Sequence, residues 1–155
     1  MKQKITQLFL VIVCFNIYGN VFSQSSLQDT AAVAQVIRTF FKGMQLADTS
    51  IMRRTLCNDV IFQSVATTAK GNIVRTEQIA HFFKSITQTT AGSLNEQLDS
   101  IIIQTDGKLA SVWAPYHFYY QAKLLHCGIN SFQLINTEVG WKIQYIIDTR
   151  YKCTL

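Results

Sequence analysis

The stretch LLHCGINSFQLINTEVGWKIQYIIDTRYKC, from Leu124 to Cys153, holds the residue types best suited to chemistry. His126 stands near its start, and Asp148 and Arg150 stand near its end. An imidazole can act as a general base or donate a hydrogen bond to a bound carbonyl, because its pKa lies close to neutral pH. The alternative is a hydrogen-bonded histidine of the core. The position of Asp148 relative to His126 separates these two interpretations.

The register of the last hairpin predicts that position. Pairing Asn136 with Trp141 brings the apolar residues of both strands to one face. This register puts Asp148 on the face away from His126, so a catalytic His–Asp pair would need a β-bulge between them. Asp148 and Arg150 share a face, either as a salt bridge or interface pair, or with Arg150 binding an anionic ligand group. The further pairs are Leu134/Ile143, Phe132/Tyr145 and Asn130/Ile147.

An aromatic segment precedes this hairpin and is interrupted by Pro115, which indicates an edge, a bulge or a bend. If the chain turns at Gln121-Ala122, the cross-strand neighbour of His126 is His117. If the turn is shifted by one residue, that neighbour is Tyr116. Aromatic side chains on both faces suit a ligand pocket on one side, or core and interface packing. The candidate ligand contacts are Trp113, Tyr116, His117, His126, Phe132, Tyr145 and Arg150, and weaker candidates near a pocket mouth are Phe62, Ser64, Arg75 and His81.

The cysteines and the N-terminus predict the compartment. Residues 1–23 carry Lys2 and Lys4, a short apolar run and a small residue at Ser23, which is typical of a signal peptide cut before Gln24. The run is too short to span a bilayer, and a retained anchor is the alternative. We therefore expect a secreted or periplasmic single domain over residues 24–155. In an oxidising compartment Cys127 and Cys153 form the preferred disulfide, with three free thiols as the alternative.

Charge and motifs exclude several functions. Removal of Lys2 and Lys4 lowers the formal net charge from +5 to about +3, and no basic stripe interleaves with aromatic residues. We therefore expect no nucleic-acid partner. No CxxC or His-rich spacing predicts a metal site, and no Gly-rich phosphate loop or nucleophile motif predicts a cofactor.

The hydrophobic periodicity predicts helices first and a long sheet afterwards. Three helices are expected, over 26–47, over a short segment capped by Asp48-Thr49, and from Thr76-Glu77 to about Gln88. A strand over 60–68 turns at Lys70-Gly71-Asn72 into a short partner. Four strand patterns follow, over 95–105, 108–120, 123–136 and 140–151. This order predicts an α+β fold whose antiparallel sheet curves around the helices and leaves a cone-shaped cavity.

This order, with the segments GWKIQYIIDTR and VWAPYHFYYQAKLLHCGINSFQLI, resembles the nuclear transport factor two-like superfamily, which has the cystatin-like fold. The HCG and GWKI…DTR segments look more narrowly like its lumazine-binding branch. The resemblance covers about Ser26 to Cys153. It implies a conical pocket and, commonly, a homodimer formed by sheets that pack face to face. It selects no reaction, because the superfamily contains isomerases, dehydratases, cyclases and proteins with no assigned reaction.

Three functions follow as expectations. The first is a secreted domain that binds a small apolar or aromatic molecule without turnover, because no acid–base pair is evident. The second is an isomerase or dehydratase that uses His126 as general base, with Tyr116 or Asp148 as its partner. The third is an interaction module whose sheet face dimerises.

Overall fold

The first helix supplies much of the core. The computed structural model describes residues 17–153, with side chains described from residue 26 on, so most of the predicted signal peptide lies outside the described residues. Helix α1 runs over Ile17–Gln45. Val33, Ile37, Phe40 and Met44 lie three or four residues apart and are all buried, so one stripe of the helix faces the sheet. No described helix is both long and apolar enough to cross a bilayer.

Two shorter helices close one end of the fold. Helix α2 (Thr49–Arg53) is capped by Asp48, whose carboxylate accepts hydrogen bonds from the backbone N–H groups of Ser50 and Ile51. Helix α3 (Ile79–Thr87) begins after Gln78, later than predicted. Thr76 and Glu77 belong to a strand instead, because they pair with Gln63 and Phe62 across a hairpin.

The sheet has seven strands in the order β2-β1-β7-β6-β5-β3, and β4 also pairs with β5. One predicted strand is divided into β3 and β4, because the ladder is interrupted at residues 99–101. All pairings are antiparallel except that between β1 and β7, so the sheet is mixed rather than wholly antiparallel as predicted. The strands are β1 (Leu56–Thr68), β2 (Gly71–Glu77), β3 (Leu94–Leu98), β4 (Ile102–Thr105), β5 (Leu109–Tyr120), β6 (Lys123–Thr137) and β7 (Gly140–Thr149).

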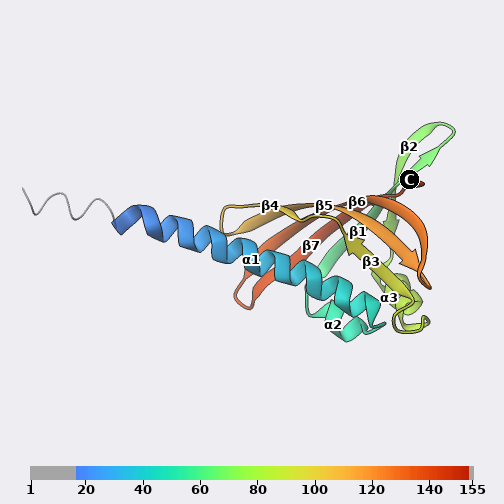
Figure 1. The fold of residues 1–155 in the computed structure, drawn as a ribbon, viewed down its shortest axis with the longest axis horizontal. Coiled ribbons are helices and arrows are strands. Elements are labelled where there is room, and N and C mark those ends of the chain that lie inside the picture. Colours follow the sequence, from blue (N-terminus) through green and yellow to red (C-terminus); the bar gives the residue numbers. More distant parts are fainter. Residues whose placement is uncertain (1–16, 154–155) are drawn as a thin grey trace, which may run out of the picture.

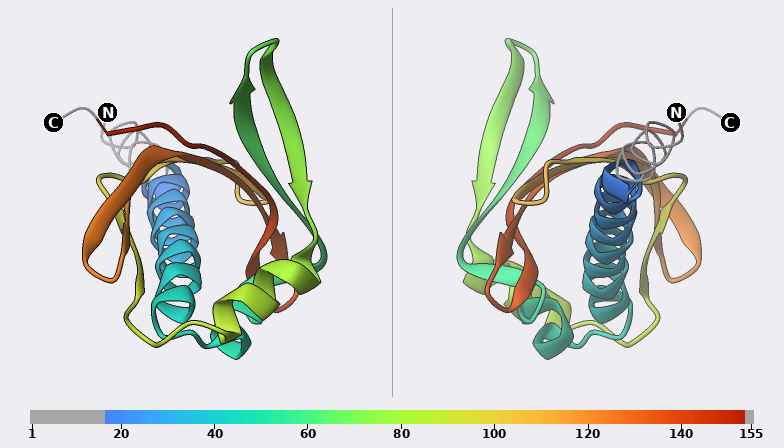
Figure 2. Two further views of the ribbon diagram at one scale, coloured as in Figure 1. Left: turned by 90° about the vertical axis from the view of Figure 1, so that its right-hand side faces the viewer. Right: turned by 90° about the vertical axis from the view of Figure 1, so that its left-hand side faces the viewer.

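The sheet arches over α1, as the predicted cone requires (Figure 1; Figure 2). In Figure 2 the short helices lie below the arch, and the β1–β2 hairpin projects away from it. The buried side chains of the inner face, Ala110, Val112, Phe132, Leu134 and Ile143, belong to the same hydrophobic cluster as the buried residues of α1. The core therefore occupies one part of the arch, between α1 and the central strands.

Two bulges decide which side chains face inward. The β6–β7 register is as predicted at Asn136/Trp141 and Leu134/Ile143, but Gln144 is then left unpaired and later pairs shift by one residue. Asn130 therefore faces Asp148 rather than Ile147. This corrects the predicted register, because the extra residue returns Asp148 to the inner face.

The second bulge lies beside His126. The turn at Gln121-Ala122 is as predicted, with both residues at positive φ, as a two-residue hairpin of primed type requires. Leu125 is left unpaired, so His126 lies opposite Phe118 and not opposite His117 or Tyr116 as predicted.

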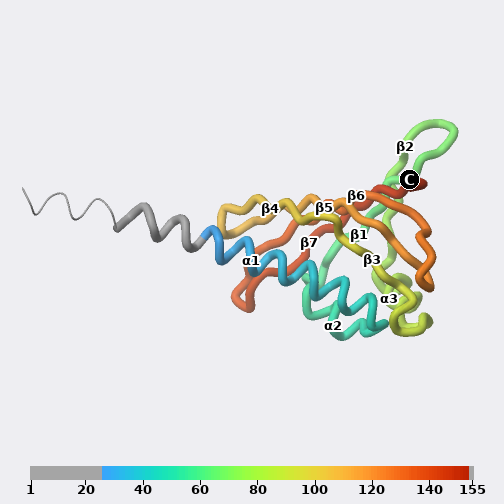
Figure 3. Tube along the Cα trace, in the orientation of Figure 1, coloured from blue at the N-terminus to red at the C-terminus, as the bar shows by residue number. Residues whose placement is uncertain are grey.

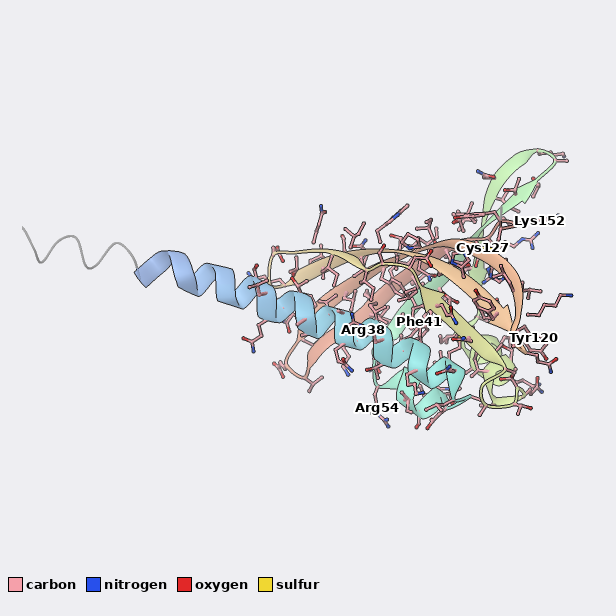
Figure 4. All side chains as sticks on the ribbon, viewed as in Figure 1. Arg38, Phe41, Arg54, Tyr120, Cys127 and Lys152 are labelled. Atoms are coloured by element: carbon pink, nitrogen blue, oxygen red, sulfur yellow. A yellow bond between two sulfur atoms is a disulfide. The ribbon has the colours of Figure 1, made fainter. Side chains whose placement is uncertain are left out.

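The C-terminal tail is attached to β6. Tyr151 exchanges two backbone hydrogen bonds with Cys127, of 3.0 and 2.9 Å. Cys127 and Cys153 form a disulfide, with their Cα atoms 5.2 Å apart. Figure 3 traces the chain to this tail, and Figure 4 labels Cys127 and Lys152 at the same end of the sheet. The tail thus extends the β6–β7 pairing past the end of β7.

Gly128 permits a close approach of neighbouring groups at this end of the sheet. A Cβ atom at this position would lie 1.9 Å from the carbonyl oxygen of Thr149 and 2.6 Å from a ring carbon of Tyr116. Only glycine leaves room for both groups. The HCG segment therefore combines a ring on the inner face, one half of a disulfide and a close backbone contact.

Candidate functional site

A row of polar side chains crosses the inner face of the sheet. Ser64 of β1 is the register partner of Asp148 of β7, and Asp148 is the partner of Asn130 of β6. Neighbouring strands place directly opposed side chains on the same face, so the three groups point into the arch together. They are surrounded by apolar residues of the same face, which makes this row the main polar feature under the sheet.

Asp148 accepts hydrogen bonds from three residues. Ser64 and Tyr116 donate their hydroxyl groups to it, the latter over 3.3 Å, and Arg150 donates Nε–H over 2.7 Å. Arg150 also donates to the Ser64 hydroxyl over 3.2 Å, and Tyr116 donates to the Thr149 carbonyl over 3.1 Å. Asp148 is buried and its charge is matched by Arg150, so it acts as the centre of a fixed network.

This network changes the ionisation of its other members. Burial raises the pKa of Tyr116 far above its usual value, and the nearby carboxyl groups of Glu96 and Asp148 raise it further. Burial alone lowers the pKa of Arg150, but the hydrogen bond and charge of Asp148 raise it overall. Tyr116 therefore stays a phenol and Arg150 stays a cation at any ordinary pH.

Glu96 is a second carboxyl group in the arch. Strand β3 points it inward, and its Oε1 accepts a hydrogen bond of 2.6 Å from Asn130 Nδ2. Burial raises the pKa of Glu96 to about 7; the Asn130 hydrogen bond opposes the rise, the charge of Asp148 adds to it, and the charge of Arg150 reduces it. Glu96 thus exchanges a proton near neutral pH, which is the property expected of a group that takes part in binding or proton transfer.

His126 lies at the edge of this group. Its ring stacks on Phe118 with centroids 4.9 Å apart and meets the Tyr116 ring edge-on at 5.8 Å. Burial and the charge of Arg150 lower its pKa, so the imidazole is neutral at pH 7. No carboxylate forms a hydrogen bond with it, so the His126–Asp148 pair that the enzyme alternative could use is not formed, even though both residues lie on the inner face.

Five phenylalanine rings form an apolar wall around the polar row: Phe62 and Phe132 lie on the same inner face of the sheet, and the other three come from α1 and α3. Successive centroids lie 6.0, 5.3, 5.9 and 5.0 Å apart. The polar row and the phenylalanine wall together line a hollow of about 90 Å³. A second hollow adds His126, Tyr116 and His81, and the two share Met44, Glu77, Phe82, Glu96, Asp148 and Arg150, so they are parts of one cavity. The wall consists of Phe132, Phe41, Phe40, Phe62 and Phe82.

The predicted ligand contacts divide between the two faces of the sheet. Tyr116, His126, Phe132 and Arg150 line the cavity. The other three lie on the outer face, because strand alternation turns them away from the arch. Trp113 is 51% exposed there, His117 bonds Asp99, and Tyr145 donates its hydroxyl to Gln63 over 2.6 Å.

Sequence reasoning missed the residues that complete the site. Ser64 was a weak candidate, and Glu96 and Asn130 were not candidates at all. A signal for Glu96 was available, since it alternates with Leu94 and Leu98 in a strand and therefore shares their face. Asn130 likewise alternates with Phe132 and Leu134. Among residues 26–153, no three His, Cys, Asp or Glu side chains are placed to hold a metal ion together.

Comparison with known proteins identifies the fold. No protein-family model and no curated protein matches the sequence. Solved structures do match: an NTF2-like (nuclear transport factor two-like) protein with a cystatin-like fold from Novosphingobium aromaticivorans has a TM-score of 0.71 at 11% identity, over 90% of this chain and 93% of that one. An NTF2-like protein of unknown function from Shewanella baltica has a TM-score of 0.62 at 19% identity, over 82% and 97%.

A third structural relative has an assigned class of activity. It is a proposed dehydratase of the NTF2-like family from Streptomyces avermitilis, with a TM-score of 0.61 at 13% identity, over 81% of this chain and 98% of that one. None of these comparisons reaches the lumazine-binding branch, which stays a prediction. The curved sheet over an N-terminal helix, with a cavity beneath it, is the NTF2-like, cystatin-like fold.

Proposed function

We propose that this protein binds a small, mostly apolar or aromatic molecule in the cavity under the sheet. The observation that carries the proposal is a cavity that combines five phenylalanine rings, from the sheet and from α1 and α3, with the Ser64–Asp148–Asn130 row. Binding pockets for small molecules combine apolar walls with a few fixed polar groups in this way. The walls supply affinity, and the polar row fixes the orientation of the ligand.

The fixed state of the polar row supports binding rather than turnover. Asp148 already accepts hydrogen bonds from Ser64, Tyr116 and Arg150, so most of its acceptor positions are occupied. A network of this kind is preorganised, and its geometry does not need to change when a ligand enters.

Filling the cavity tests the proposal. Ile146→Phe adds volume to a residue that lines the hollow, whereas Ile73→Phe makes the same change in the projecting β1–β2 hairpin. In a thermal-shift screen of aromatic fragments, we expect ligands that stabilise the wild type and Ile73→Phe but not Ile146→Phe. A crystal structure with the best fragment should show it against the phenylalanine wall. Ligands that stabilise all three proteins equally would place binding elsewhere.

A proton-transfer enzyme, of the isomerase or dehydratase kind, is the second candidate. Glu96 favours it, because a carboxyl group with a pKa of about 7 inside a cavity suits general acid or base catalysis. In this version Glu96 replaces His126 as the proton-transfer group. The Streptomyces avermitilis relative supports this class only through its name. The test is exchange of the α-protons of cyclic ketones in deuterated water, which should be fast with the wild type and lost in Glu96→Gln.

We propose that the chain is secreted or periplasmic and forms a homodimer through the outer face of its sheet. Support for the dimer is the exposed apolar surface of Ile61, Ile102 and Trp113, at 45%, 57% and 51%. Analytical ultracentrifugation should show a dimer that Trp113→Glu dissociates. Detection of the chain in the periplasm or medium, with its N-terminus near Gln24, would test the location. A monomer at micromolar concentration would remove the third candidate, a dimerising interaction module.

A further inference from the structure

Glu96 is a cavity carboxyl group without a cationic partner. The ion pairs among the described residues are Asp148–Arg150 and His117–Asp99, and Glu96 belongs to neither. Its only side-chain hydrogen bond is the one that Oε1 accepts from Asn130. No fully buried side-chain oxygen or nitrogen in the described part of the chain lacks a hydrogen-bond partner. The second oxygen of Glu96 therefore keeps exposed surface, and Glu96 lines both hollows of the cavity as well as a neighbouring groove.

Asp148, unlike Glu96, has a cationic partner and several hydrogen-bond donors. Arg150 lies 2.7 Å from Asp148, and two hydroxyl groups complete its hydrogen bonds. An ionised carboxyl group that is buried without such partners is costly, because water and counter-ions no longer stabilise its charge. The raised pKa of Glu96 is the measure of this cost. A ligand that brought a positive charge would remove the cost, and this gain would appear as affinity.

The other charged groups around the cavity do not supply that charge. Glu77 of β2 lines the cavity and adds a negative charge, and Asp148 and Arg150 cancel each other. His81 of α3, His126 of β6 and the phenol of Tyr116 complete the titratable lining. On α1, Arg38 and Lys42 line a neighbouring groove that Glu96 and Phe41 also border, but both basic side chains are exposed and neither makes an ion pair with Glu96. The lining thus holds three carboxyl groups and one guanidinium group.

The rest of the cavity also suits a cation. Phe41 and Phe82 are the rings of the wall that keep exposed surface in the cavity, and aromatic faces attract ammonium groups. Asn130 donates from Nδ2 to Glu96, which leaves its own carbonyl oxygen as an acceptor beside the carboxyl group. An ammonium group at this point would find two acceptors and aromatic rings within one cavity.

We propose that the ligand of this cavity is an organic amine, whose ammonium group pairs with Glu96 and whose apolar or aromatic body packs on the phenylalanine wall. This inference rests on the proposed binding function and specifies its ligand class. Binding selects the ionised form of Glu96, so the protein releases a proton when the amine binds below pH 7. The fraction of ionised Glu96 rises about tenfold from about pH 6 to about pH 8, and the affinity for an amine rises with it.

Three probes of similar shape test the ligand class. Phenethylamine is a cation, phenethyl alcohol is neutral and hydrocinnamate is an anion. Isothermal titration at about pH 6 and about pH 8 should show the amine as the tightest ligand at the higher pH and about tenfold weaker at the lower one. The affinity of the alcohol should not rise with pH.

Glu96→Gln is the decisive variant. It keeps the size of the side chain and an acceptor for Asn130 but cannot ionise, so the amine should lose its advantage over the alcohol at both pH values. Glu138→Gln, in the exposed loop between β6 and β7, makes the same charge change and should leave the wild-type pattern intact. Circular dichroism of both variants confirms that they fold.

The outcomes separate this inference from the proposed function. If the alcohol or hydrocinnamate binds at least as tightly as the amine at about pH 8, the inference is wrong, although the cavity still binds small aromatic molecules. An amine affinity that is equal at both pH values, or that survives Glu96→Gln, also overturns it. If none of the three probes binds at millimolar concentration, the proposed binding function fails with it.

Discussion

Asp148 on the inner face and Asp99 beside the outer face each hold a basic side chain close by, yet the two pairs differ in kind. Asp148 is 8% exposed and has two hydroxyl donors besides Arg150. Asp99 meets only His117, over 2.8 Å, and its side chain is 47% exposed, against 11% for that of Asp148. Exposed ion pairs contribute little because water screens and competes with them, whereas a buried carboxylate depends on its partners. An aspartate with a basic partner therefore forms a fixed site on one face and a surface contact on the other.

The largest effect should come from crowding the inner face. Gly128→Ala places a Cβ atom against the Thr149 carbonyl and the Tyr116 ring. Because the first of these contacts is with backbone, we expect a loss of roughly 3 kcal/mol or more in the free energy of unfolding, measured by urea denaturation. Ser131→Ala, at an outward-facing position of the same strand, should change it by less than about 0.5 kcal/mol. Equal effects of the two changes would remove the distinction between the faces.

The Cys127–Cys153 disulfide lies outside the inner-face network. We expect its contribution to the free energy of unfolding to be as large as that of the network. It closes a loop with a sequence separation of 26 residues. The double variant Cys127→Ser/Cys153→Ser should lose about 3 kcal/mol of unfolding free energy, since the unfolded chain regains the freedom of that loop. Cys57→Ser, which changes the free thiol of β1, is the control. A double variant as stable as this control would show that backbone pairing alone holds the tail.

Matched changes of the two aspartates test the comparison directly. Asp148→Asn should cost about 2 kcal/mol, because Arg150 then lacks its counter-ion inside the network. Asp99→Asn should cost less than about 0.5 kcal/mol. Thermal and urea denaturation measure both. A loss on replacing Asp99 that equals the loss on replacing Asp148 would contradict the assignment of the outer pair to the surface.

Glu96→Gln should change stability only at the higher pH values, and there it should be stabilising. The pKa of Glu96 is about 7 in the folded protein against a reference value of 4.5, so the folded state loses stability as the pH rises through this window. Near pH 4 the variant should match the wild type, and at about pH 8 it should be more stable by about 2 kcal/mol. Urea denaturation across the pH range measures the difference. A difference that does not change with pH would mean that folding does not raise the pKa of Glu96.

Local sequence patterns were sufficient for most elements of the fold. The stripe of Val33, Ile37 and Phe40 predicted α1, and the turn residues Gln121-Ala122 set the hairpin between β5 and β6. Asp48 capped α2 as expected. The predicted start of α3 was wrong. Thr76-Glu77 is a good capping sequence for a helix, but pairing with β1 holds these two residues in a strand. Here a contact between strands overrode a local preference.

The candidate site was predicted only in part, because its composition depends on bulges. An unpaired Gln144 and an unpaired Leu125 each shift a register by one residue, and a shift of one residue exchanges the two faces of a strand. Nothing in either residue type marks it as a bulge. The prediction that Asp148 faces away from His126 was therefore wrong, and Trp113, His117 and Tyr145 were assigned to a pocket that they do not line.

The sequence by itself determined the order of helices and strands and the curved α+β architecture, since hydrophobic periodicity and turn residues act over a few neighbouring positions. Only the tertiary structure decided that Ser64, Asp148, Asn130 and Glu96 meet in one cavity. These four residues come from four strands, and they converge because pairing registers and sheet curvature bring distant segments together. The ionisation of Glu96 follows from the same cause, because burial beside Asp148 exists only once the sheet has closed over α1.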